Sequence, residues 1–194
     1  MIKDKIKILR KKFKKFRIDG YIVPKNDEYF SEYTKNDRLK NISNFSGSAG
    51  IAVILKKNNY LFVDGRYTIQ AQKEADKNFK IIEIHKKLPH AIIKNHNLGY
   101  DPKLFTSKSL KHHFSNNNLI SIKDNLIDQI FTFKEKSTKP FYSLKKNIVG
   151  ETHQSKIIKI SKFLKSNKAD YLFVSAPENV AWLLNIRGYD NPNS

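Results

Sequence analysis

The sequence contains no cysteine, so disulfides, thiolate metal sites and cysteine nucleophiles are all excluded. It also has no apolar run near the roughly 20 residues that a membrane-spanning helix needs. The first 16 residues are basic throughout and lack the apolar core of a secretory signal. These absences predict a cytoplasmic protein with no membrane partner.

Arginine is scarce, although the chain is strongly basic. The formal net charge is +19, yet only Arg10, Arg17, Arg38, Arg66 and Arg187 are arginine. Sequence-specific DNA recognition depends on the planar arginine fork, so we interpret the charge as a solvated lysine surface. No specific nucleic-acid partner is expected, and non-specific binding to phosphates is the weaker alternative.

The composition is otherwise that of a folded protein. Hydrophobic residues make up 39% of the 194 residues and aromatic residues 12%, which is too rich for a disordered chain. Domains most often run to about 100 to 150 residues. The length therefore predicts one complete domain and part of another.

An apolar stripe opens the chain. Its members alternate in steps of four and three residues, which predicts an amphipathic helix: Ile2, Ile6, Leu9, Phe13 and Phe16. Such a helix could lie on a membrane or fill a partner's groove. We favour packing on its own domain, because Asp19-Gly20 then turns the chain into a strand over 21–24.

A β-hairpin is expected next. The strand-like runs 51–57 and 60–64 are joined by Asn58-Asn59, and asparagine tolerates the positive φ of a two-residue turn. Further strands and helices then alternate, with strands over 80–84, 98–100 and 119–122 and helices over 67–75, 89–96 and 107–114. This order predicts an α/β fold in which helices flank a mixed sheet.

The charged segment 135–140 ends in proline and is interpreted as a linker. The first domain is therefore assigned to residues 1–145, and residues 146–194 to the beginning of a second α/β domain. There we expect a helix over 153–164, a strand over 170–175 and a helix over 177–184. At an offset of 150 residues, Phe13 matches Phe163 and Tyr21 matches Tyr171, so the second domain is predicted to be related to the first and truncated.

Two short motifs stand next to strands. Residues 44–50, Asn-Phe-Ser-Gly-Ser-Ala-Gly, run straight into a strand rather than a helix, so they favour a structural turn over a phosphate loop. Asp64-Gly65-Arg66-Tyr67 lies where a strand ends and a helix begins, the usual place for binding residues in α/β sheets. Because arginine is scarce, Arg66 is predicted to need a planar donor, either for a structural ion pair or for a substrate.

No metal site is predicted in this chain. Asp27, Glu28 and Glu32 form a carboxylate cluster, but hard cations need oxygen ligands converging from several segments. The six histidines show neither the His-Glu-x-x-His helix nor a pairing with a carboxylate motif. We interpret them as surface or core residues.

In order and spacing, eight segments together resemble the N-terminal creatinase-type domain of three-domain Xaa-Pro aminopeptidases. They are 20–24, 27–33, 37–38, 44–50, 64–71, 99–102, 125–130 and 177–188. The resemblance covers nearly all of the chain. One departure is Tyr29, which stands where relatives often have histidine.

The resemblance implies two creatinase-type domains followed by a catalytic pita-bread domain that is absent here. That domain holds two divalent metal ions, usually manganese, on two Asp, one His and two Glu, and removes a residue that precedes proline. It implies no catalytic or metal-binding residue in this chain, and as partners it implies peptides with proline at the second position and the catalytic domain. A homodimer is also compatible with it. Candidate contacts with substrate or with the other domain are Asp27, Glu32, Arg38, Asp64, Arg66 and Tyr67. An aminopeptidase-like module that binds peptides without catalysis is the alternative.

Overall fold

The computed structural model describes residues 1–31, 34, 36–131 and 139–189. The chain forms two compact units, Met1–Phe133 and Lys134–Ser194, which are described separately. None of the helices in the described ranges is both long and apolar enough to cross a membrane.

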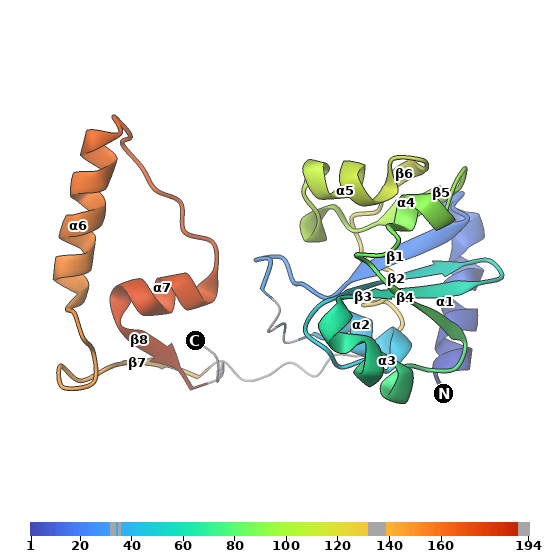
Figure 1. Ribbon diagram of the computed structural model, residues 1–194, viewed down its shortest axis with the longest axis horizontal. Coiled ribbons are helices and arrows are strands. Elements are labelled where there is room, and N and C mark those ends of the chain that lie inside the picture. Colours follow the sequence, from blue (N-terminus) through green and yellow to red (C-terminus); the bar gives the residue numbers. More distant parts are fainter. Residues whose placement is uncertain (32–33, 35, 132–138, 190–194) are drawn as a thin grey trace. The chain divides into compact units, whose positions relative to one another are not determined.

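A six-stranded mixed sheet is the centre of the first unit, with strand order β4-β3-β2-β1-β5-β6 (Figure 1). Its strands are β1 (Gly20–Pro24), β2 (Gly50–Leu55), β3 (Asn59–Val63), β4 (Phe79–Glu83), β5 (Asn97–Tyr100) and β6 (Asn118–Ser121). β2 is antiparallel to both neighbours, and every other pairing is parallel. The carboxyl ends of β1, β3, β4, β5 and β6 therefore share one edge of the sheet. The predicted α/β fold with a mixed sheet is confirmed.

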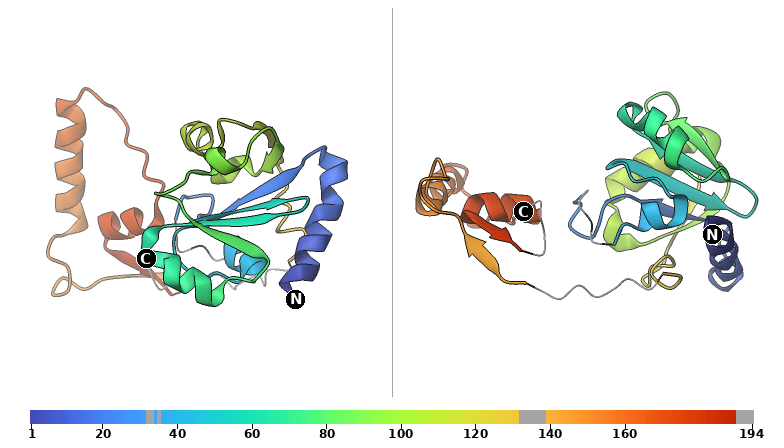
Figure 2. Two further views of the ribbon diagram at one scale, coloured as in Figure 1. Left: turned by 45° about the vertical axis from the view of Figure 1, so that its right-hand side comes forward. Right: turned by 90° about the horizontal axis from the view of Figure 1, so that it is seen from below.

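Helices cover both faces of this sheet (Figure 2). One face carries α1 (Ile2–Phe16), α2 (Arg38–Ser43) and α3 (Thr68–Glu74), and the other carries α4 (Pro89–Ile92) and α5 (Ser107–Phe114). Side chains alternate along β1, so Tyr21 and Val23 pack with the first set of helices and Ile22 with the second. All five residues of β1 are buried, as expected for a strand covered on both faces.

The amphipathic helix α1 packs on its own domain, as the apolar stripe predicts. Ile6, Leu9 and Phe13 are at most 2% exposed and belong to the core. Arg10 fixes the helix to the β2–β3 hairpin, because its Nε donates to Leu55 O at 2.8 Å and its Nη2 to Asn59 Oδ1 at 2.9 Å. The apolar face of α1 is therefore buried in the core of its own unit.

The hairpin is confirmed, but its predicted two-residue turn is wrong. Asn59 is already in β3, where it pairs with Ile54, and the connection is Lys56 to Asn58. The turn is closed by a bond from Leu55 N to Asn58 O of 2.8 Å, and neither asparagine has a positive φ. The side chain of Asn59 instead bridges Arg10 and Asn78 O, which favours its place in the strand.

Helical boundaries differ from the predictions at two places. α4 ends at Ile92 rather than near 96, because Ile93 is extended and Asn95 adopts a left-handed φ of 59°. α2 was not predicted from the sequence. Its N-cap is Asp37, whose side chain accepts from Lys40 N, and its C-cap is Asn44, which adopts a left-handed conformation.

The second unit contains β7 (Phe141–Ser143), α6 (His153–Ser166), α7 (Pro177–Leu184) and β8 (Ile186–Gly188). β7 and β8 pair antiparallel. A buried lysine joins the two helices: Lys156 Nζ donates to Trp182 O at 2.6 Å and to Asn185 Oδ1 at 2.7 Å. The same ammonium lies 4.1 Å from the centre of the Trp182 ring.

The strand predicted over 170–175 is wrong, since these residues have no regular structure. A strand needs a neighbour for its backbone groups, and the described strands of this unit, β7 and β8, pair with each other. Tyr171 and Phe173 are about 90% exposed, whereas Tyr21, the counterpart of Tyr171, is fully buried in β1. The helix α1 has its counterpart in α6 at the offset of 150 residues, but the strand β1 has none.

The division between the two units falls at residues 133 and 134, earlier than the predicted boundary at 145. The reason is that β7 pairs with β8, which places residues 141–143 with the second unit. Most of the predicted linker over 135–140 lies outside the described residues.

Candidate functional site at the carboxyl edge of the sheet

The sequence motifs meet at one edge of the sheet. The segment 25–37 follows β1, Asp64–Tyr67 follows β3 and residues 101–106 follow β5, and all of these strands end at the carboxyl edge. The small-residue loop 44–50 reaches the same edge, because it precedes the antiparallel strand β2. Ligands of open α/β sheets usually bind outside the carboxyl ends of the strands, so this edge is the candidate functional face.

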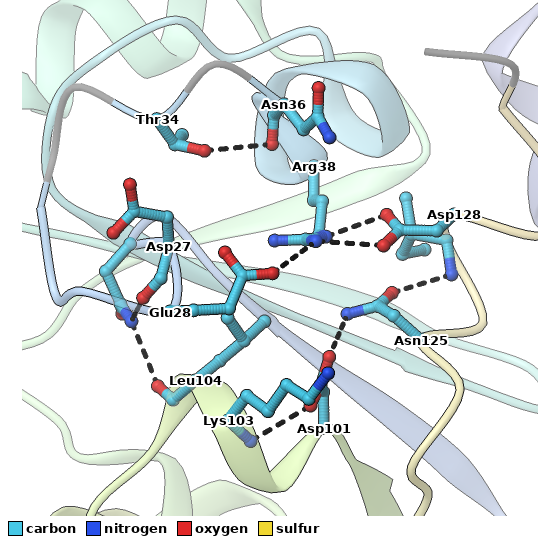
Figure 3. A network of polar contacts seen from close by, with 12 residues as sticks. Asp27, Glu28, Thr34, Asn36, Arg38, Asp101, Lys103, Leu104, Asn125 and Asp128 are labelled. Carbon is cyan, nitrogen blue, oxygen red and sulfur yellow. Dashed lines mark hydrogen bonds and ion pairs between the residues drawn. The ribbon is translucent and has the colours of Figure 1, made fainter. Parts of the chain in front are cut away.

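Arg38 is the centre of a polar network at this edge (Figure 3). Its side chain is 5% exposed and forms a bidentate pair with Asp128. Nε donates to Oδ1 at 2.7 Å and Nη2 to Oδ2 at 2.8 Å. Nη2 also donates to Glu28 Oε1 at 3.0 Å. A bidentate guanidinium–carboxylate pair of this kind is among the strongest polar contacts in proteins. Arg38 therefore ties the segment after β1 to the segment after β6.

A second set of bonds continues the network beneath Asp128. Asn125 Nδ2 donates to Asp101 Oδ2 at 2.9 Å, and Asn125 Oδ1 accepts from Ile127 N at 2.9 Å. The hydroxyl of Tyr21 accepts from Leu126 N at 3.3 Å. These residues are buried, so their polar groups are satisfied inside the protein rather than by water.

Burial and charge act together on the ionisable groups of the network. Burial alone would lower the pKa of Arg38, but its bonds to Asp128 and the charges of Asp128 and Glu28 raise it. Burial opposes ionisation of Glu28, yet a backbone hydrogen bond and the charge of Arg38 hold its pKa below the usual value. Burial raises the pKa of the Tyr21 hydroxyl. Both partners of the Arg38–Glu28 pair therefore carry charge at neutral pH.

Asp37 and Lys25 fix the start of α2 next to this network. Asp37 Oδ1 accepts from Lys40 N at 2.9 Å and caps the helix, while Oδ2 forms an ion pair with the buried Lys25. The helix that carries Arg38 is thereby attached to the end of β1. The adjacent residues Asp37 and Arg38 thus place the Lys25–Asp37 and Arg38–Asp128 ion pairs together at the start of α2.

Asp27 organises the turn that follows β1. Its Oδ1 accepts from Tyr29 N at 3.0 Å and from Ser31 N at 2.9 Å. Phe30 adopts a left-handed φ of 61°, which is unusual for a bulky residue. The turn presents Tyr29 and Phe30, which are 58% and 51% exposed, at the edge. Glu32 lies outside the described residues.

Arg66 forms an ion pair, one of the two roles expected of it, but it does so at the surface and with a residue of its own loop. Its side chain is 73% exposed, and its Nε donates to Asp64 Oδ1 at 2.9 Å within the same loop. Asp64 also accepts from Arg66 N and caps the 3₁₀ turn η1 (Gly65–Tyr67). These two bonds from Arg66 lower the pKa of Asp64. The guanidinium lies 5.5 Å from the centre of the Tyr67 ring, so the exposed arginine stands beside a partly buried tyrosine that packs against the core.

A pocket of about 300 Å³ opens at the same edge, between the ends of β1 and η2 (Pro102–Leu104). Its wall is mostly apolar, with polar groups from Lys25 and Ser48, and includes Pro24, Phe30, Gly50, Ile51, Leu104 and Phe105. Tyr67 borders the small-residue loop beside it, because its hydroxyl lies 2.6 Å from that of Ser48. The loop 44–50 therefore forms part of a pocket as well as a turn.

Two residues of the network, Asp128 and Asn125, were not predicted from the sequence as partners of Arg38 and Asp101. Both lie in a segment that was recognised only through its resemblance, and Asp128 stands 90 residues from Arg38. The available signal was the rarity of arginine, which applied to Arg38 as well as to Arg66. Among the described residues, no three His, Asp or Glu side chains are grouped to hold a metal ion.

The two units match family models separately. Residues 5–130 match a model described as the creatinase/prolidase N-terminal domain, and residues 132–194 match a second model with the same description. Apart from the first three residues of α1, the described helices and strands of each unit fall within these ranges.

Relatives match along almost the whole chain. A probable Xaa-Pro aminopeptidase P of Laccaria bicolor is 34% identical over 94% of this chain and 31% of its own length. Xaa-Pro aminopeptidase 1 of Dictyostelium discoideum is 35% identical over 97% of this chain and 34% of its own length.

A solved structure has the same fold. The X-prolyl aminopeptidase of Caenorhabditis elegans, described as a cytosolic enzyme with a di-nuclear active site, superposes with a TM-score of 0.83 at 27% identity. The match covers 99% of this chain and 35% of that enzyme. The chain thus spans about a third of the length of the relatives it matches. It belongs to the creatinase/prolidase N-terminal domain family.

Proposed function

We propose that the chain is the non-catalytic N-terminal portion of a Xaa-Pro aminopeptidase, a hydrolase that removes an N-terminal residue preceding proline. The observation that carries the proposal is the match of nearly the whole chain to about a third of such enzymes. The cytosolic description of the Caenorhabditis elegans relative supports a cytoplasmic parent. The parent's substrates are peptides with proline at the second position.

In this proposal the hydrolysis itself is performed outside the chain. Two divalent metal ions, manganese by resemblance, would activate water in the catalytic domain of the parent. The di-nuclear site of the Caenorhabditis elegans relative supports this division. The residues of this chain would instead shape access to the active site and contact the catalytic domain.

We assign that contact to the carboxyl edge. The loop after β3 carries the exposed Arg66 between the partly exposed Asp64 and Tyr67. The Asp27 turn exposes Tyr29 and Phe30 beside the pocket. Glu32 belongs to the same motif and keeps its proposed contact role. Arg38 is buried, so it acts by holding this edge together rather than by touching substrate.

The purified chain is expected not to release the N-terminal residue from a peptide with proline at the second position, even with added Mn²⁺. The measurement follows the released amino acid over a range of chain concentrations. A mock purification from the same host controls for contaminating peptidases. Metal-dependent turnover that rises in proportion to the chain, and is absent from the mock, would overturn the proposal.

A further inference from the structure

Histidines and carboxylates are distributed very unevenly in the first unit. Five of the six histidines fall between residues 85 and 113. Between residues 84 and 123 the sequence has one carboxylate, Asp101, and its oxygens accept bonds from Asn125 and from Lys103 N. This stretch contains α4 and α5, which form a layer on one face of the sheet, so the layer collects imidazoles with few acidic partners. His85, at its start, lies 3.5 Å from Asp64 Oδ2.

His113 lies at the inner side of that cluster. Its Nδ1 is buried and has no hydrogen-bond partner among the described residues. The ring of His112 stands 4.8 Å away, centre to centre, and that of Phe114 6.2 Å away. His90 of α4 is close, since its Nδ1 lies 3.0 Å from His112 O. With its proton on Nε2, neutral His113 leaves one acceptor unpaired, whereas protonation of Nδ1 would bury a positive charge and an N–H donor without an acceptor.

The charged and titratable groups on the neighbouring segments are mainly basic. α4 contributes His90, and α5 and the segments that follow α4 and β6 contribute Lys94, His96, Lys108, Lys111, His112 and Lys123. The carboxylates are Asp101, which precedes α5 and is already bonded, and Asp124, which follows Lys123. His112, in ring contact with His113, and the nearby His90 carry no negative charge, so neither would compensate a proton on His113.

We propose that the α4–α5 layer is a pH-sensitive element, closed when His113 is neutral and loosened when its buried Nδ1 takes a proton. Burial first, and then the neighbouring His112 and His90, lower the pKa of His113, which agrees with the geometry. The layer also supplies part of the edge, because Leu104 and Phe105 line the pocket and Asn26 donates to Leu104 O at 3.0 Å. Acidification would thus act on the candidate functional face.

The direction of the effect follows from proton linkage. A histidine whose pKa is lowered in the folded state binds fewer protons there than in the opened state. The closed layer is therefore favoured above the ordinary histidine pKa of about 6.5. That preference is lost as the pH falls below this value toward the lowered pKa of folded His113.

The test uses the complete chain and two measurements between pH 8 and pH 5. Histidine NMR titration should place the midpoint of His113 below the ordinary histidine value of about 6.5. Hydrogen exchange, corrected for intrinsic rates, should show protection of α5 falling at least ~threefold relative to β1 and β2 on acidification.

Two variants separate protonation from packing. His113→Phe keeps an aromatic ring but cannot titrate, so its α5 protection should no longer depend on pH, and His113→Asn serves the same purpose if the phenylalanine is not accommodated. His112→Gln, on the same helix but exposed, should keep the acid response. A midpoint for His113 at or above about 6.5, or an unchanged acid response in both His113 variants, would overturn the proposal.

Discussion

Replacing Arg38 with lysine is expected to lower the free energy of unfolding of the first unit by about 1.5 to 3 kcal/mol, the range for a hydrogen bond to a charged group. The lysine ammonium cannot reproduce the two parallel bonds to Asp128 and also reach Glu28. The arginine side chain is only 5% exposed, so water has little access to its place, although it reaches the carboxylates of Glu28 and Asp128, which are 40% and 36% exposed. Urea unfolding followed by far-ultraviolet circular dichroism measures the loss.

Arg66→Lys is the matched control. Arg66 is 73% exposed and paired within its own loop, so its replacement should change stability by less than about 0.5 kcal/mol. Fluorescence of Trp182, the only tryptophan, reports the second unit and should be unaffected by either change. Equal losses for the two variants would show that the Arg38 network does not stabilise the unit.

Phe13→Ala is expected to cost more, about 3 to 5 kcal/mol, which is the usual range for removing a buried phenylalanine side chain. Phe13 is 2% exposed in the core between α1 and the sheet, and a cavity would remain in its place. The same urea experiment measures the effect. Much of the expected stability of a domain of this size would be lost.

Ile8→Ala on the same helix provides the comparison. Ile8 is 45% exposed, so its truncation should cost less than about 1 kcal/mol. If α1 instead kept its apolar face for a membrane or another protein, Phe13 and Ile8 would respond alike. A loss below about 1 kcal/mol for Phe13→Ala would therefore contradict the packing of α1.

The α/β fold was predictable because the relevant signals are local. The apolar stripe of α1 spans a few helical turns, and the apolar runs of β2 and β3 each span a few residues. The turn at Lys56–Asn58 was not predictable in the same way, since Asn59 is held in its strand by Arg10, 49 residues away. The failed strand at 170–175 has the same explanation, because a strand depends on neighbours that its own sequence does not specify.

The candidate site was only half predictable for a related reason. The rarity of arginine drew attention to Arg66, but the buried bidentate pair belongs to Arg38, and rarity could not distinguish the two. The distinction depends on Asp128, which the fold brings to Arg38 from 90 residues away. Asp64, by contrast, is two residues from Arg66, so that contact could be expected from the strand-to-helix motif itself.

The most direct test of the proposed role is a comparison of two variants in the full-length parent enzyme. Arg66→Ala alters the carboxyl edge, and Lys57→Ala alters the opposite edge, in the turn between β2 and β3. If the carboxyl edge faces substrate or the catalytic domain, Arg66→Ala should lower kcat/KM about tenfold or more, which corresponds to about 1.4 kcal/mol, with Tm unchanged. Lys57→Ala should leave kcat/KM at its original value. Equal kcat/KM values for both variants and the unaltered enzyme would contradict the assignment of this edge as the functional face.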